Sequence, residues 1–383
     1  PGVSVRVSFN GRKCDGYIVG RANSSAHVGR MQYLDKINNE TPLLTTSILN
    51  LSRAVARKYA CNLMDVLRFA IPVAINSIKE VTCCFSDPKP LSSEILKYYP
   101  TSYFDSLTNG DPSHVVWTPL PTTEPFELMA EVCKVRNGSI LVLVPDSKSV
   151  ARCLEIFLSS GIGKKISTWN SELTKSQRYA NYLQILNGTA QIVIGVRGAI
   201  FLPMQNLSLI ILWDEGNENY SEIRTPGWHV REVAIERTRQ EGCALILGSF
   251  SPSLIATKYL LAGWLKPLNA QREVFRELSP KFNGISELSS PDQRGRISTK
   301  AWKTIQKGLQ SGPVLVQVPL RGYIRSLICQ KCANCCKTFT WIEESDMLLR
   351  FEWIENKNMI SVKETPFGHK EITLNSPCSK LCK

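Results

Sequence analysis

Cysteines near the C-terminal end of the chain are the residues best suited to do chemistry. The chain has 13 cysteines, of which seven are scattered between Cys14 and Cys243 and six fall between Cys329 and Cys382. Two thiolates at the Cys329-x2-Cys332 spacing can hold one tetrahedral Zn²⁺. No secretory signal opens the sequence, so we expect reduced, metal-binding thiols here rather than a disulfide framework.

The other zinc ligands must come from the same C-terminal segment. The candidates are Cys329, Cys332, Cys335, Cys336, Cys378 and Cys382, with His369 as a spare. We expect one complete Cys₄ site made by Cys329, Cys332 and a distant pair, in which Cys335 or Cys336 can replace one member. Two bound zinc ions, or a tail that holds only reduced thiols, stay open as alternatives.

A second candidate site is an acidic pair, Asp214 and Glu215, that follows the apolar run 209–213. P-loop motors hold Mg²⁺ and orient the attacking water with acidic residues at such a strand end. They also need a glycine-rich loop ending in Gly-Lys-Ser/Thr, whose backbone N–H groups and lysine cradle the phosphates. No Gly-Lys-Ser/Thr occurs in the sequence, and the nearest imitation, Gly163-Lys164-Lys165, follows a helical pattern instead of a strand.

The segment in which a phosphate loop belongs is 118–125, after the apolar run Val115 to Trp117. It contains no glycine, no lysine and three prolines. Proline donates no backbone hydrogen bond, and the carboxylate of Glu124 would repel a phosphate. We therefore expect that ATP binding has been lost, that Asp214 and Glu215 are vestigial, and that the chain has no catalytic residue.

The basic residues are concentrated at the two ends of the chain. The formal net charge is +13: residues 1–80 carry 11 Lys/Arg against 5 Asp/Glu, residues 81–293 carry 20 against 21, and residues 294–383 carry 15 against 7. Such a distribution is typical of a protein that binds a polyanion, because each neutralised phosphate releases counterions. The predicted DNA contacts are Arg6, Arg12, Lys13 and Arg21. No run of about 18 apolar residues occurs, so no membrane span is predicted.

The elements that must position these residues follow from local patterns. Within 1–35, Val3, Val5 and Val7 alternate with polar residues, and Asn10-Gly11 marks a tight turn, so we expect a small basic β-module. Residues 41–70 have helical spacing that starts at Thr41-Pro42. The Ser-, Pro- and Asp-rich stretch 76–113 is interpreted as a linker or a remnant.

The middle of the chain has a different pattern. Between residues 114 and 290, apolar runs at 140–144, 191–194, 209–213 and 244–247 alternate with helical patterns. Continuous apolar strands separated by helices predict a parallel α/β sheet covered on both faces. Asp146, Asp214 and Ser249 each follow such a strand, at the edge where ligands of these sheets bind. Beyond residue 291 we expect a helix over 300–309, a strand over 314–318, and the cysteine-rich tail.

Seven segments together resemble the PriA family of replication restart proteins. They are 57–60, 65–67 with Pro72, 170–173, 191–203, 209–220, 247–253 and 319–323, in the order of the family. Residues 191–203 are similar to the family's Ile-Val-Ile-Gly segment, and 247–253 to the motif that couples the ATP site to DNA. The acidic motif departs from the family at Gly216-Asn217. The pattern is similar to the actinobacterial branch, whose nucleotide loop is also eroded.

The resemblance implies an architecture in four parts. Residues 1–75 would be a β-rich DNA-binding module, 76–113 a linker, 114–290 a RecA-like helicase lobe with a degenerate ATP site, and 291–383 the start of a second lobe with the zinc cysteines. The family carries eight cysteines for two zinc ions, whereas this tail has six.

The function that the resemblance implies is replication restart without helicase activity. The protein would be cytoplasmic and nucleoid-associated, bind forked DNA, and act with primosome or helicase-loading proteins to reload the replication machinery. An active ATP-dependent 3'-5' DNA helicase is one alternative. A zinc-containing nucleic-acid-binding factor unrelated to replication is another.

Overall fold

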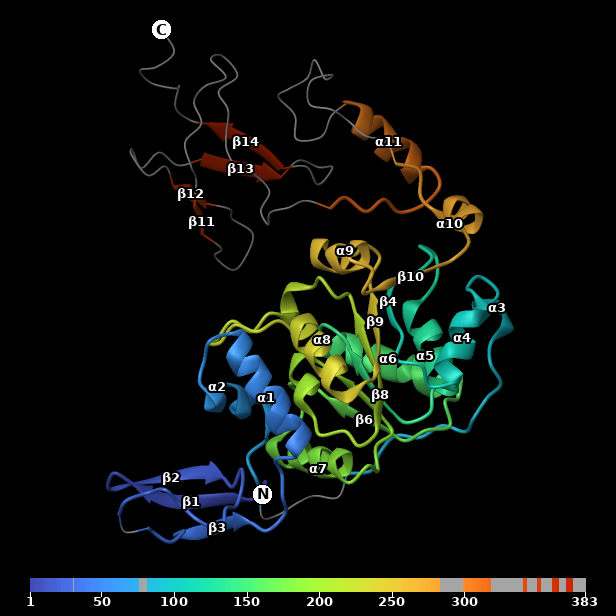
Figure 1. The fold of residues 1–383 in the computed structure, drawn as a ribbon. Helices are drawn as coiled ribbons and strands as arrows, with labels where there is room; N and C mark the ends of the chain where they lie inside the picture. The colour runs from blue at the N-terminus through green and yellow to red at the C-terminus, as the bar shows by residue number, and fades with distance from the viewer. Residues whose placement is uncertain are drawn as a thin grey trace. The chain divides into compact units, whose positions relative to one another are not determined.

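The structure is a computed structural model that describes residues 1–29, 31–75, 81–282 and 299–317, with four short strands between residues 340 and 374. It has two compact units, Pro1–Phe282 and Asn283–Lys383 (Figure 1). Among the described residues, no helix has the length and apolar character needed to cross a membrane.

The chain begins with a three-stranded antiparallel sheet in the order β2-β1-β3. The strands are β1 (Ser4–Phe9), β2 (Arg12–Tyr17) and β3 (Lys36–Asn39). Asn10 and Gly11 have positive φ angles of 49° and 73°, as a two-residue hairpin turn requires. The predicted hairpin is therefore confirmed, and a third strand lies just beyond the predicted range.

Two helices follow this sheet, α1 (Thr46–Lys58) and α2 (Leu63–Ala70). The Thr45 hydroxyl accepts a hydrogen bond from the backbone N–H of Ile48 and caps α1. The helical prediction for this region is confirmed, but the first helix starts later than Thr41-Pro42 because the capping hydroxyl comes from Thr45.

A seven-stranded sheet forms the centre of the first unit, in the order β10-β4-β9-β8-β5-β7-β6, and every neighbouring pair is parallel. Its strands are β4 (His114–Thr118), β5 (Ser139–Leu143), β6 (Ile166–Trp169), β7 (Ile192–Gly195), β8 (Leu207–Trp213), β9 (Ala244–Gly248) and β10 (Lys266–Asn269). The predicted parallel α/β lobe is confirmed.

Helices cover both faces of this sheet. They are α5 (Pro125–Val135), α6 (Ser147–Ser160), α7 (Lys175–Leu186), α8 (Val230–Glu241), α9 (Leu254–Leu261) and α10 (Arg272–Leu278). One apolar core joins α5 and α6 to one face of the sheet, and a second core joins α7, α8 and also α1 and α2 to the other. The two N-terminal helices therefore belong to the core of the lobe.

The stretch 76–113 differs from the expected linker. Its described part, 81–113, contains α3 (Ser93–Leu96) and α4 (Thr101–Thr108). Tyr99, Tyr103 and Leu107 are buried in the core beside α5. These apolar residues recur at every fourth position, a helical spacing that the surrounding serines and prolines obscure.

The second unit is described only in part. It contains α11 (Thr299–Leu309) and two antiparallel hairpins, β11 (Thr340–Ile342) with β12 (Arg350–Glu352), and β13 (Ile360–Glu364) with β14 (Lys370–Leu374). The predicted helix is confirmed, but residues 313–317 are not in a strand. The six candidate zinc cysteines and His369 lie outside the described residues.

Candidate nucleic-acid interface and carboxyl edge of the sheet

Asp214 and Glu215 lie at the carboxyl end of β8, as predicted, but both side chains have partners within the chain. Asp214 has a positive φ of 53°, and its Oδ2 accepts a 2.6 Å hydrogen bond from Nδ2 of Asn217. Glu215 is completely buried, and its Oε2 lies 2.7 Å from Nη1 of Arg231 on α8. The acidic pair thus stabilises the loop after β8.

Ser253, the N-cap residue of α9, completes the Glu215 site. Its backbone N–H donates to Glu215 Oε1 at 2.6 Å, and its hydroxyl donates to Oε2 at 2.9 Å. The same hydroxyl also accepts from Arg231 at 3.2 Å and from the backbone N–H of Ala256 at 3.1 Å. One carboxylate therefore connects the end of β8 to the starts of α8 and α9. The ion pair with Arg231 and the hydrogen bonds from Ser253 compensate the free-energy cost of burying its charge.

Aromatic rings fill the edge of the sheet beside this carboxylate. Trp117 at the end of β4 and Trp213 at the end of β8 have ring centroids 5.6 Å apart. Trp213 also contacts Phe126 and Phe250, at centroid distances of 6.3 and 5.4 Å. Gly248 lies between the two tryptophans, and a Cβ atom there would come within 2.8 Å of the Trp117 ring. Side chains thus occupy this part of the carboxyl edge.

The N-terminus of α5 holds a carboxylate from the chain itself. Glu124 is the N-cap residue, with its side chain accepting from the N–H of Phe126, and it forms an ion pair with Arg152 of α6. In P-loop proteins the N-terminus of the corresponding helix receives phosphate. Here Glu124 supplies the negative charge, and the charged residues that also line the cleft next to it, of about 190 Å³, are Glu94, Glu127 and Lys97.

Lys164, from the nearest imitation of the missing motif, has a structural role. Its Nζ donates to the carbonyl oxygens of Cys133, at 2.6 Å, and of Arg136. These carbonyls lie at the C-terminal end of α5, where a cation is favourable. Burial lowers the pKa of Lys164. Because Lys164 precedes β6, it lies at the amino end of the sheet, away from Asp214.

The predicted DNA contacts of the β-module lie on different faces. Arg6 pairs with Asp15 across the β1–β2 ladder, and Lys13 pairs with Ser8, so Arg6 and Lys13 share one face. Arg12 is paired with Phe9 and lies on the other face. Arg21 follows β2. The four residues therefore do not form one surface, because neighbours in a strand alternate in direction.

Arg6 is also engaged inside the module. Its Nε lies 2.8 Å from Asp15 Oδ1 and its Nη2 lies 2.9 Å from Oδ2. This pairing lowers the pKa of Asp15 to about 2, first through the hydrogen bond from Arg6 and then through one from Asn38. Lys13 and Arg12 are exposed and form no ion pair that the structure shows among the described residues.

Polar contacts join α1 to α8 of the lobe. The Ser47 hydroxyl donates to Glu241 Oε1 at 2.9 Å, and Lys58 forms an ion pair with Glu232. Ser47 lies near the start of α1 and Lys58 at its end, whereas Glu232 and Glu241 lie near the start and end of α8, so the helices run antiparallel. The N–H of His229 also donates to the Tyr59 hydroxyl at 3.1 Å.

Comparisons with known proteins show what the chain is similar to. Residues 1–72 match the family model of the PriA 3'DNA-binding domain. Most of the chain is similar to probable replication restart protein PriA from Mycobacterium leprae, with 31% identity over 88% of this chain and 54% of that protein. The chain is therefore similar to PriA proteins over most of its length, and its first 72 residues are similar to one of their domains. The PriA protein of Mycobacterium tuberculosis (strain H37Rv) is 33% identical over 87% of this chain and 53% of its own length.

Other bacterial branches match less of the chain or at lower identity. The Treponema pallidum replication restart protein PriA is 25% identical over 89% of this chain. The Synechocystis PriA is 40% identical, but over 33% of this chain and 16% of its own length. The chain spans about half the length of the curated PriA proteins that match most of it. The resemblance to PriA proteins of the actinobacterial branch, which was inferred from the sequence, is confirmed by these mycobacterial relatives.

Arg231 is the residue of this site that sequence reasoning missed. It lies 16 positions after Glu215, in a helical pattern with no recognised motif. Its proximity to Glu215 depends on how α8 packs on the sheet. The DNA contacts Arg6, Arg12, Lys13 and Arg21 stay predictions, as do the domain boundaries.

Proposed function

We propose that this chain is the DNA-binding part of a replication restart protein that binds forked DNA and helps reload the replication machinery without ATP-driven unwinding. The observation that carries the proposal is the match of residues 1–72 to the 3'DNA-binding domain of PriA. The sequence excess of Lys/Arg in this region supports it, because phosphate contacts supply much of the affinity for DNA.

The proposal treats the parallel α/β lobe as a RecA-like helicase lobe that has lost its nucleotide site. Glu124 at the N-terminus of α5 and the aromatic rings at the strand ends support this part. At the N-terminus of α5 a bound triphosphate would lie beside the Glu124 carboxylate, whereas it needs backbone N–H donors and a lysine there. In this proposal the lobe orients the DNA-binding module and partner proteins of the primosome.

The cysteine-rich tail would hold zinc. Cys329, Cys332, Cys378 and Cys382 are the ligands in the proposed Cys₄ site, with Cys335 and Cys336 able to substitute. Four thiolates are the donor set that structural zinc prefers, and such a site stabilises a small fold. Metal analysis of the purified chain is expected to give one zinc per chain, and the Cys329→Ser variant less than one. A metal-free wild type would contradict the zinc site and leave the DNA-binding proposal intact.

The test of the main proposal is DNA binding and ATP hydrolysis by the same preparation. We expect salt-dependent binding to forked DNA and no DNA-stimulated ATP turnover, with Asp214→Asn indistinguishable from wild type in both assays. Turnover that disappears in Asp214→Asn would favour the active helicase instead. Equal binding to forked DNA and to RNA of the same length would favour a nucleic-acid-binding factor unrelated to replication.

A further inference from the structure

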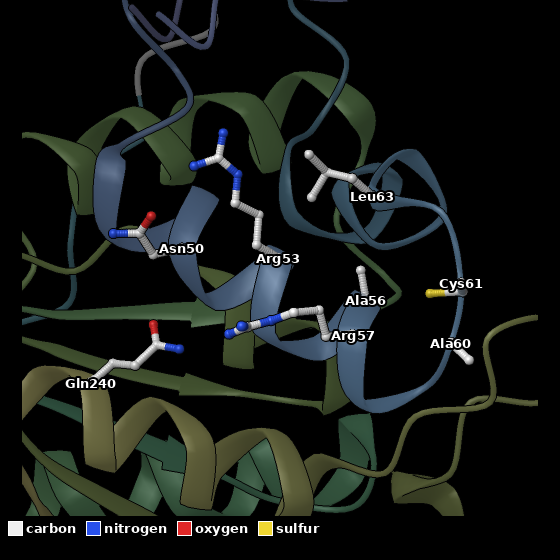
Figure 2. A pocket seen from close by; sticks show the side chains of 8 residues that line it. All are labelled: Asn50, Arg53, Ala56, Arg57, Ala60, Cys61, Leu63 and Gln240. Carbon is white, nitrogen blue, oxygen red and sulfur yellow. The ribbon is translucent and has the colours of Figure 1, made fainter.

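A groove lies between α1 of the N-terminal region and α8 of the lobe (Figure 2). Its volume is about 730 Å³. The polar side chains that line it are Asn50, Arg53 and Arg57 from α1 and Gln240 from α8. The other lining residues are Ala56, Ala60, Cys61 and Leu63. Figure 2 shows the Arg57 side chain extending toward the side of the groove where Asn50 and Gln240 lie.

The two arginines carry uncompensated charge. Both are exposed, and no ion pair of either one is found among the described residues. The three carboxylates of α8 have partners other than these two arginines: Glu232 pairs with Lys58, Glu241 with Ser47 and Arg237, and Glu236 with Gln240 and Arg239. The two arginines lie one helical turn apart on α1, a rise of about 6 Å between their Cα atoms, and no residue in the lining of the groove is negatively charged.

The lining indicates the chemistry of the ligand. Guanidinium groups and amides donate hydrogen bonds that suit phosphate oxygens, and small apolar side chains suit the sugar. None of the lining residues is aromatic, so the groove offers no platform on which a base could stack. These features suit a ligand that is bound through its phosphates, without contacts to bases.

We propose that the α1–α8 groove binds the sugar-phosphate backbone of DNA, with Arg53 and Arg57 each contacting a phosphate. This inference rests on the proposed function and adds a second contact surface to that of the β-module. Helices α1 and α8 are joined at both ends, by the hydrogen bond from Ser47 to Glu241 and by the ion pair of Lys58 with Glu232. The groove therefore exists before DNA binds. DNA held here would contact α1 and Gln240 of α8 together.

The experiment measures the affinity of the full chain for a fluorescein-labelled DNA fork by anisotropy, at salt concentrations from 50 to 200 mM. The test variant is Arg53→Gln/Arg57→Gln. The control is Arg272→Gln/Arg276→Gln, which removes two exposed arginines at the same spacing on α10. A third variant, Arg53→Lys/Arg57→Lys, keeps the charge. Thermal unfolding of each variant verifies that it is folded.

Loss of two phosphate contacts would make the slope of log K against log salt shallower by about 1.4 to 1.8. Over the fourfold salt range, the wild type would then lose about tenfold more affinity than the glutamine variant. We expect this change for the groove variant and wild-type slopes for the control and the lysine variant. Wild-type binding with equal slopes in the groove variant and the control overturns the groove and leaves the proposed function standing.

Failure of the wild type to bind the fork would overturn the proposed function and the groove together. Cys61 lines the groove and is partly exposed, so protection of its thiol from alkylation reports directly whether DNA binds there. We expect bound DNA to slow its alkylation, read by peptide mass spectrometry, while Cys84 in the same sample reacts at an unchanged rate. An unchanged rate at Cys61, or protection by an acidic peptide but not by the fork, would also overturn the assignment to DNA.

Discussion

The carboxylate of Glu215 is completely buried and lies 2.7 Å from the guanidinium of Arg231, 16 positions further along the chain. In an ATP-driven motor, acidic residues at this strand end serve Mg²⁺ and water. Here the carboxylate instead accepts hydrogen bonds from Arg231 and Ser253, both of which belong to helix starts. In this protein the carboxylate at the strand end is held by structural partners on all sides that the structure describes.

Removal of one partner of this pair should destabilise the protein strongly. In Glu215→Ala the Arg231 charge stays buried without its counterion, so the free energy of unfolding should fall by about 3–5 kcal/mol. Urea unfolding followed by circular dichroism measures it. Asp214→Asn is the control, since Asp214 has no ion pair among the described residues and Asn217 can still donate to the amide oxygen. Equal stability of the two variants would show that the pair is not needed.

The aromatic cluster at the carboxyl edge should tolerate no added atom at Gly248. A Cβ atom there would lie 2.8 Å from Trp117 and 3.1 Å from Trp213, so Gly248→Ala forces the rings apart and should cost about 1–3 kcal/mol. Gly216→Ala is the matched control at the same edge, where the nearest atom would be at an ordinary 3.4 Å. Both are compared by denaturant midpoint, and an unaffected Gly248→Ala would mean that the rings do not pack as described.

His229 should make stability fall in mild acid. Burial, and then the nearby Arg231, lower the pKa of His229 from 6.5 to about 4. Between these values the unfolded chain binds a proton that the folded protein does not, so the free energy of unfolding falls as pH drops from 6.5 towards 4 and is unaffected above 6.5. His229→Asn retains an N-cap acceptor for Arg231 and should show a smaller decline. Urea titrations at pH 7 and pH 5 compare the two, and parallel declines would exclude His229.

In the β-module, the Lys13 side chain should contribute more to DNA affinity than the Arg6 side chain. The Arg6 guanidinium is held in a two-point contact with Asp15, whereas Lys13 on the same face is exposed. We expect Lys13→Gln to make the salt slope for fork binding shallower by about 0.7 to 0.9. Arg6→Gln should change it little, since Asp15 already neutralises that charge. The reverse order would show that DNA separates Arg6 from Asp15.

Much of the lobe could be predicted because its strands are buried on both faces and therefore appear as continuous apolar runs such as 209–213. The hairpin at Asn10-Gly11 and the helices of 41–70 also have local signals. Helix α4 was missed because Tyr103 and Leu107 lie in a polar, proline-containing stretch. Arg231 and the α8 wall of the groove could not be predicted, since their neighbours are set by helix packing and no local pattern encodes it. The zinc ligands stay a prediction.

The shared core of α1, α2 and α8 has a consequence for how this protein can be divided. Phe69 of α2 packs edge-on against the fully buried Trp228, with ring centroids 5.7 Å apart, and Leu43, Ile48 and Val55 lie in the same core as Tyr220 and Val233. A fragment that starts after residue 72 would expose this apolar face to water and would tend to aggregate. The match to the DNA-binding domain ends at residue 72, but the folded unit continues beyond it. Each part therefore covers apolar surface of the other, and we expect neither to fold well alone.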